Sequence, residues 1–164
     1  MMDASGKRVG QALFTQMMHG VLIQIELTGL PAGWHGLHLH EVGVCEPPFT
    51  SAGAHFAPRR NGHGFDGENG PHAGDLPNIL IGSDGKAMVE IFNDRVSLSA
   101  GQEGDRGLLG RAIGAVESAA GVPSSSLLGE KGTALILHER ADDYRTDPDG
   151  NAGDRIACGV IKLS

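Results

Sequence analysis

Six of the eight histidines in this chain, together with one aspartate, form a pattern that indicates metal binding. Two alternate in the segment GLHLH, three more follow in a long polar stretch, and the sixth ends the apolar segment ALILH. The set is His38, His40, His55, His63, His72, Asp75 and His138. Imidazole is a common ligand of both copper and zinc, whereas a carboxylate suits zinc better than reduced copper. Six imidazoles and one carboxylate are more than one ion can use, so more than one metal ion is expected.

The His-x-His pair lies in a segment, residues 34–41, whose alternation predicts a β-strand. Leu37 and Leu39 point to one face of such a strand, and His38 and His40 point to the other. If the leucines fill the core, both histidines stand on the outer surface of the sheet, where they can bind one ion.

A side chain that binds no metal is the commoner explanation for any single histidine here. His63 alone, in a loop, would most often be a solvated side chain, and only the whole set in one small domain favours a metal site. His19 and His35 lie outside the pattern. His35 shares the core-facing parity of the neighbouring leucines, so we expect both to be structural or exposed.

The elements that must position these ligands are mostly strands separated by turns. The expected strands are residues 9–18, 21–27, 34–41, 79–81, 87–92, 133–138 and 155–161. Residues 42–77 have no sustained period, which predicts a long functional loop that a metal would organise. Residues 108–121 carry apolar side chains at helical spacing, but Gly110 and Gly114 weaken that pattern, so we expect a short helix or a mobile insertion.

Composition restricts the class of protein further. The 164 residues suit one domain, and 26 glycines and 8 prolines favour an all-β fold over a helix bundle. A net charge of -7 makes nucleic acid or an anionic membrane a poor partner. No apolar stretch approaches the ~20 residues of a membrane span, and the first residues show no signal-peptide pattern. Cys45 and Cys158 could be free thiols or one disulfide, and their spacing does not decide between the two.

Several long motifs in this order resemble the copper–zinc superoxide dismutases, in particular the bacterial type. They are GLHLHEVGVC (36–45), TSAGAHFAP (50–58), HAGDLPN (72–78), ALILHERADDY (134–144) and GNAGDRIACGVI (150–161). The resemblance covers most of residues 6–161 and is highly specific in combination.

The resemblance implies a role for each matching residue. It implies that one copper per chain is bound by His38, His40, His55 and His138. It implies that one zinc per chain is bound by His55, His63, His72 and Asp75, with His55 bridging the two ions. It further implies that Asp142 links a copper histidine to a zinc histidine, that Arg155 guides the anionic substrate, and that Cys45 and Cys158 form a disulfide.

The same resemblance implies a flattened Greek-key barrel or sandwich with long metal-binding and electrostatic loops. Residues 1–164 would form a single domain that dismutes superoxide to O₂ and H₂O₂, with His55 and Arg155 taking part in catalysis. We expect the protein to lie in the periplasm or otherwise outside the cytoplasm. We also expect it to form a homodimer.

Three departures from the family pattern affect these expectations. The first strand is nearly absent, which indicates either a shortened chain or an exposed sheet edge that a partner covers. About twenty extra residues form an insertion near 101–126, a region that often makes subunit contacts in the family. Ala57 replaces a common asparagine, and Arg59 and Arg60 lie between His55 and His63, which changes the zinc loop without removing a ligand.

Two other functions use the same residues. A copper-binding or copper-buffering protein needs only the ligands, whereas catalysis also needs Arg155 and an open copper position. A zinc-stabilised structural domain predicts no dependence on copper and no effect of Arg155→Ala.

Overall fold

The structure is a computed structural model that describes residues 1–99 and 125–163. The helix or insertion expected at 108–121 lies outside these residues. The strands are β1 (Met2–Asp3), β2 (Gly10–Met17), β3 (Gly20–Thr28), β4 (Gly33–His35), β5 (Leu37–His40), β6 (Ile79–Ile81), β7 (Lys86–Asn93), β8 (Thr133–His138) and β9 (Arg155–Ile161). A 3₁₀ turn, η1 (Thr50–Ala52), interrupts the long loop after β5. The all-β prediction is confirmed.

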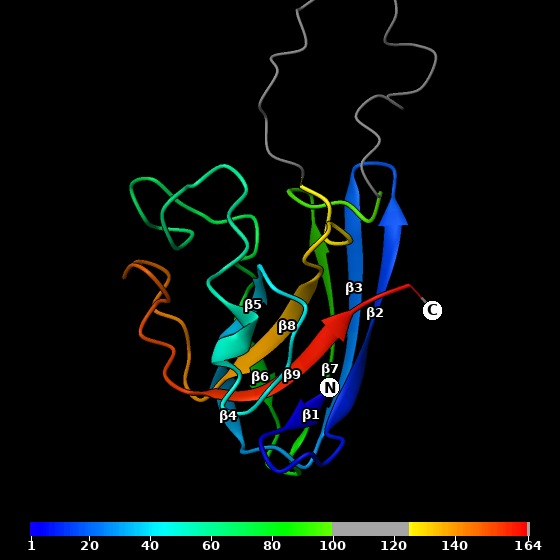
Figure 1. Cartoon of the computed structure of the whole chain (residues 1–164). Helices are drawn as coiled ribbons and strands as arrows, with labels where there is room; N and C mark the ends of the chain where they lie inside the picture. The colour runs from blue at the N-terminus through cyan, green and yellow to red at the C-terminus, as the bar shows by residue number, and fades with distance from the viewer. Residues whose placement is uncertain (100–124, 164) are drawn as a thin grey trace, which may run out of the picture.

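The strands pair antiparallel in three sheets, with orders β1-β9-β8-β5, β2-β3-β7 and β4-β6. The long loops project from the strand layers on the side of β5 and β8 (Figure 1). The expected barrel is not closed within residues 1–99 and 125–163, because the strand pairs stop at these three sheets. The first strand, expected to be nearly absent, is reduced to two residues paired with β9.

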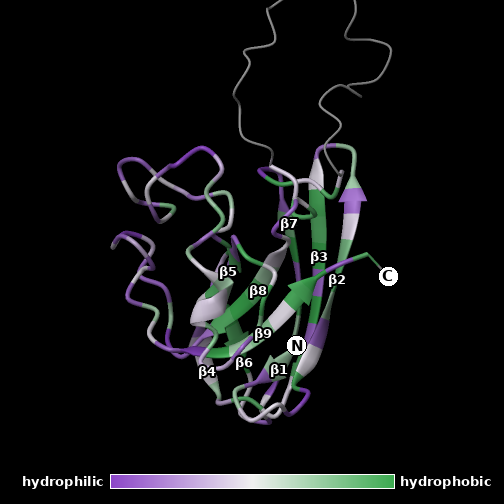
Figure 2. Cartoon of the chain, viewed as in Figure 1, coloured by the Kyte–Doolittle hydropathy of each residue, from purple (hydrophilic) through white to green (hydrophobic). Residues whose placement is uncertain are grey.

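One hydrophobic core joins the sheets. On β3, Ile23 and Ile25 are buried while Gln24 and Glu26 are exposed, as the alternation predicts. The same core includes Leu37 and Leu39 of β5 and residues of β8 and β9. Figure 2 shows the apolar colouring concentrated on β3 and β8 and the polar colouring on the long loops. No helix in the described part of the chain is long and apolar enough to cross a membrane.

The prediction of one strand over residues 34–41 was wrong at Gly36. Residues on its two sides belong to different sheets, β4 pairing with β6 and β5 pairing with β8. The Gly36 N–H donates to the Arg140 carbonyl at 2.8 Å, and its carbonyl accepts from the His138 N–H at 2.9 Å. A Cβ at this position would lie 3.0 Å from Cβ of Ala152, so the close crossing favours glycine. Side-chain alternation continues through Gly36 although the strand pairing changes.

Candidate metal centre

The His-x-His strand and the strand that ends in the last histidine are neighbours. β5 pairs with β8, and His138 is the last residue of β8. Leu37 and Leu39 face the core, so His38 and His40 face away from it, as predicted. Both histidines are nevertheless fully buried rather than on a surface. The long loop covers this side of the sheet.

The loop docks on β5 through backbone hydrogen bonds. Leu39 donates to the Gly74 carbonyl, Phe56 donates to the Leu39 carbonyl, and Gly74 donates to the Phe56 carbonyl, each at 2.8 Å. Isolated antiparallel β-bridges pair His55 with His40 and Asp75 with His38. Two parts of the loop, residues 55–56 and 74–75, are therefore held against one strand.

A first group of four histidines converges on one point. Possible ligand atoms of His38, His40, His55 and His138 all lie within 4.8 Å of one another. One buried ring nitrogen of each lacks a hydrogen-bond partner among the described residues. These atoms are Nδ1 of His38 and Nε2 of His40, His55 and His138. A buried polar atom without a partner is rare in a folded protein, so four together form a donor set that fits a metal ion.

The second nitrogen of each ring is held by an oxygen, which fixes the ring. Nδ1 of His40 lies 3.0 Å from the Gly53 carbonyl, and Nδ1 of His138 lies 3.0 Å from the Gly153 carbonyl. Such partners fix the orientation and the tautomer of a metal-binding histidine.

A second group surrounds one carboxylate. Oδ1 of Asp75 lies 3.0, 3.1 and 3.2 Å from Nδ1 of His55, His63 and His72, respectively. Oδ2 of Asp75 accepts the backbone N–H groups of Gly64 and His72 at 2.9 Å. The four side chains could hold one metal ion, and His55 belongs to both groups. Three imidazoles with one carboxylate form a donor set that suits tetrahedral zinc.

Asp142 connects the two groups. Its oxygens lie 2.8 Å from Nε2 of His38 and 3.0 Å from Nε2 of His63. Gly150 packs against this bridge with φ +66°, and a Cβ there would collide with the Asp142 carboxylate and lie 2.7 Å from Nε2 of His63. Only glycine fits at this position without disturbing the bridge.

Burial and charge set the protonation of the metal-free site. Burial lowers the pKa of His38 to about 3, of His40 to about 2 and of His138 to about 4. These rings are therefore neutral at pH 7, as metal ligands must be. Burial also opposes the charge on His63, but hydrogen bonds to Asp142 and Asp75 raise its pKa to about 10. Burial disfavours the Asp75 carboxylate, yet its histidine partners hold its pKa well below the usual range.

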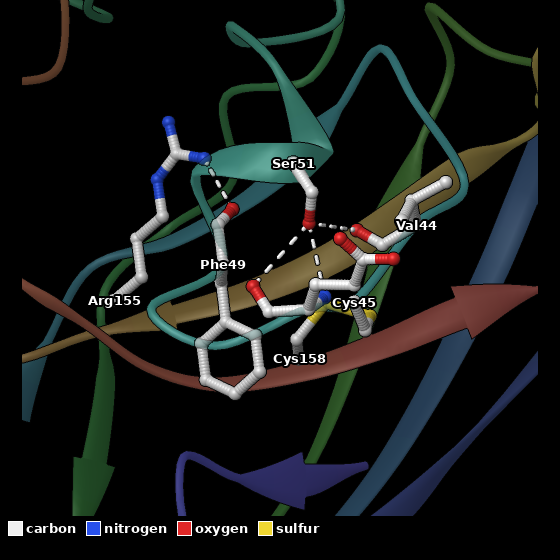
Figure 3. The surroundings of a disulfide bond; sticks show 7 residues. Val44, Cys45, Phe49, Ser51, Arg155 and Cys158 are labelled. Atoms are coloured by element: carbon white, nitrogen blue, oxygen red, sulfur yellow. Dashed lines mark hydrogen bonds between the residues drawn. A yellow bond between two sulfur atoms is a disulfide. The ribbon is translucent and has the colours of Figure 1, made fainter.

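The two cysteines form a disulfide, which settles the alternatives that the spacing left open. It joins Cys45 in the long loop to Cys158 on β9, with Cα atoms 5.7 Å apart. Arg155, on the same strand, donates to the Phe49 carbonyl at 2.7 Å, as Figure 3 shows, and to the Gly53 carbonyl at 2.8 Å. The disulfide and the guanidinium therefore hold the same loop segment.

Arg155 lies beside the four-histidine group. The carbonyl of Gly53 that accepts from it also lies against Nδ1 of His40. After burial and the neighbouring His55, the positive charge of Arg155 contributes to the lowered pKa values of His40 and His138. A fixed cation next to a metal position is suited to attracting an anion.

The histidine pattern did not reveal the positioning atoms. His35, expected to be structural or exposed, is buried, with its two ring nitrogens 2.7 Å from the His138 carbonyl and 3.0 Å from the Pro31 carbonyl. The carbonyls of Gly53 and Gly153 orient histidines without any side chain that could mark them. The only sequence feature that marks these carbonyls is the glycine at each of the two positions.

Known proteins share this arrangement of sequence and fold. Residues 8–161 match the family model described as copper/zinc superoxide dismutase (SODC). The chain is 40% identical over 162 residues to superoxide dismutase [Cu-Zn] 1 of Aquifex aeolicus, covering 98% of this chain and 83% of that protein. It is also 40% identical over 159 residues to superoxide dismutase [Cu-Zn] of Caulobacter vibrioides, covering 96% and 80%. A crystal structure of a double mutant of a SOD-like protein from Bacillus subtilis matches with TM-score 0.81 and 38% identity, covering 97% and 92%.

Proposed function

This chain belongs to the copper/zinc superoxide dismutase family, and from that premise we propose how its residues hold the two metals and dismute superoxide. The observation that supports the proposal most directly is the set of four buried imidazole nitrogens without hydrogen-bond partners. They adjoin a histidine–carboxylate set that shares His55.

His38, His40, His55 and His138 would hold one copper ion. Nδ1 of His38 and Nε2 of the other three are the atoms available for it. Bound copper would supply the one-electron chemistry of the reaction, in which two superoxide anions and two protons give O₂ and H₂O₂.

His55, His63, His72 and Asp75 would hold one zinc ion. Nδ1 of His55 faces Asp75 while its Nε2 belongs to the copper group, so His55 would bridge the two ions. Asp142 would keep His38 and His63 in fixed orientations from behind. The protein thus contributes ligands whose orientations are fixed by hydrogen bonds to their outer nitrogens.

Arg155 would attract and orient the substrate. Its guanidinium is half-buried and tied to two carbonyls, so its charge occupies a defined place beside the copper group. Superoxide is an anion and the protein carries a net charge of -7, so a local cation is needed to favour its approach.

His55 would also hold a proton for the reaction. Its Nε2 has no protein partner, so this atom would carry the proton whenever it is not a ligand.

Copper buffering without turnover is the weaker alternative. The two relatives that are 40% identical carry the name superoxide dismutase [Cu-Zn], which favours the enzyme. The firm tie between Arg155 and the loop also exceeds what a copper store would need.

We propose that the enzyme works outside the cytoplasm, with residues 1–164 forming one domain that carries the insertion near 101–126. The disulfide between Cys45 and Cys158 supports an oxidising compartment, because such bonds rarely persist in a reducing cytosol. A homodimer would be seen as twice the 17.1 kDa mass in sedimentation.

The deciding experiment compares superoxide decay with protein loaded with copper and zinc and with protein loaded with zinc alone. We expect fast decay only in the presence of copper, with one equivalent of each metal by elemental analysis. Negligible decay at full copper occupancy would instead favour a copper-binding protein. Uptake of zinc but not of copper, with negligible decay in both preparations, would favour a zinc-stabilised domain.

A further inference from the structure

The last residue of β7, Asn93, and Arg95, two positions after it, reach the turn that carries the second ligand group. The Asn93 side-chain amide donates to the Ala73 carbonyl at 2.9 Å, and Nη2 of Arg95 donates to the Asp75 carbonyl at 3.0 Å. Oδ1 of Asn93 in turn accepts the backbone N–H of Arg95 at 2.9 Å. Asn93 is buried, whereas Arg95 is partly exposed. The turn is therefore held at the carbonyls of Ala73 and Asp75 by the end of β7 and the residue two positions after it.

Arg95 also contacts the loop after β5 a second time and is linked through it to the loop after β8. Its guanidinium lies 5.5 Å from the centre of the Phe65 ring, which contacts the ring of Tyr144 with centroids 5.3 Å apart. The Tyr144 hydroxyl accepts the backbone N–H of Asn78 at 2.7 Å. The segment after β7 is thus joined through Arg95 and Phe65 to the loop after β5, and through Phe65 and Tyr144 to the loop after β8.

The carboxylate of Asp75 depends on the position of this turn. Its oxygens face three imidazoles and two backbone N–H groups, one of which belongs to His72 in the same turn. A shift of the turn by a few tenths of an ångström would move the carboxylate relative to histidines that come from elsewhere. Asn93 and Arg95 bond to the turn on its backbone side, so they resist that shift without touching a ligand atom.

We propose that Asn93 and Arg95 are positioning residues for the zinc ligand group, fixing its His72-Ala73-Gly74-Asp75 turn. The inference rests on the proposed function, because it assumes that these ligands bind zinc. Outer partners of metal ligands typically change metal affinity about 10- to 100-fold when they are removed. Arg95 acts on a backbone carbonyl, so we expect the lower end of that range.

The positive charge of Arg95 makes the proposal sharply testable. On charge alone, a guanidinium beside a divalent cation weakens zinc binding, so removing it would slow zinc release. Positioning predicts the opposite sign, because loss of the hydrogen bond and the ring contact loosens the turn. Arg95→Gln and Arg95→Lys separate the two effects, since lysine keeps the charge and one donor but lacks the planar group that lies over Phe65.

The test measures zinc release to a colorimetric chelator from the copper- and zinc-loaded protein. Arg95→Gln should release zinc about 10-fold faster and Arg95→Lys at an intermediate rate. Copper content should not change. Arg8→Gln is the matched control, because it removes one positive charge from an exposed arginine bonded to Gln11. Cobalt placed in the zinc position gives a second readout, and its visible absorption should change in the Arg95 variants but not in Arg8→Gln.

Asn93→Asp tests the other half of the clamp. It keeps an acceptor for the Arg95 N–H but loses the donor to Ala73, and should also speed zinc release. Unchanged or slower zinc release from Arg95→Gln would overturn the proposal, as would equal loss of zinc and copper. A wild-type protein that takes up no zinc, or that binds both metals without dismutation, contradicts the proposed function instead, and this is measured before any variant.

Discussion

Nε2 of His38 lies 2.8 Å from Oδ2 of Asp142, although the two residues are 104 positions apart in the chain. The other oxygen of Asp142 lies 3.0 Å from Nε2 of His63. One buried carboxylate therefore orients one histidine of each ligand group. The two groups are coupled through Asp142 from behind as well as through His55 between them.

Replacement of this carboxylate should weaken the zinc site first. In Asp142→Asn, the amide cannot accept a hydrogen bond from both imidazoles, so the ring of His63 loses its orientation. We expect zinc affinity to fall about 10- to 100-fold in a chelator competition, with a smaller effect on copper. Asp84→Asn, on an exposed turn, is the control. Unchanged zinc affinity in Asp142→Asn would show that the carboxylate does not position the ligand.

Removal of a ligand that belongs to one group should separate the two metals. His63→Ala takes one imidazole from the second group and leaves all four members of the first. Zinc content and thermal stability should therefore fall more than copper content, as measured by elemental analysis and by the thermal midpoint. Equal loss of both metals would count against two separate sites.

Arg155 should affect the rate without affecting the metals. Arg155→Ala removes the cation beside the four-histidine group, so superoxide decay should slow by at least about 10-fold at low salt. Its dependence on ionic strength should weaken as well, because less of the attraction remains to be screened. Copper and zinc contents should match the wild type. A variant that keeps the full rate would remove Arg155 from the mechanism.

The disulfide should contribute to both stability and rate. It closes a loop across 113 positions, and a loop of ~100 residues corresponds to about 4.7 kcal/mol in the chain-entropy description. Cys45→Ser with Cys158→Ser should lower the free energy of unfolding by about 4 kcal/mol in urea titrations. The rate should also fall, because Phe49 and Gly53, whose carbonyls hold Arg155, lie in the segment that the bond secures. Unchanged stability with full activity would contradict both roles.

The sequence predicts the direction of the ligands better than their burial. Alternation places Leu39 inside and His40 outside the sheet, and the structure agrees. The pattern does not predict that both histidines are covered, because the cover comes from backbone bonds between β5 and loop residues such as Phe56 and Gly74. Contacts of this kind depend on chain geometry over long separations rather than on residue type.

Positioning groups are hidden from sequence reasoning for the same reason. The carbonyl of Gly53 orients His40 and holds Arg155, yet every residue has a carbonyl. Asn93 ends β7 and Arg95 lies two residues after it, in a segment that carries no metal pattern. At Gly36 the alternation of side chains is visible in the sequence, but the change of sheet from β4 to β5 is not.

The metal-free protein should lose stability in mild acid. His38, His40 and His138 are buried and neutral, with pKa values lowered to about 3, 2 and 4. Below pH 6.5 the histidines of the unfolded chain, with pKa values near 6.5, bind protons, whereas the same histidines in the folded chain stay neutral. Their contribution to stability is therefore present above pH 6.5 and is lost as the pH falls toward 4, by about 1.4 kcal/mol per pH unit for each proton.

His63 has the opposite sign. Its pKa is raised to about 10 against the effect of burial, by Asp142 and Asp75, so its contribution is full below pH 6.5 and declines as the pH rises toward 10. Urea titrations of metal-free protein at pH 5, 7 and 9 should therefore show a maximum near neutrality. Loading with both metals should reduce the loss at pH 5, because each bound ion opposes protonation of its ligands. A metal-free protein as stable at pH 5 as at pH 7 would show that these histidines are not held neutral.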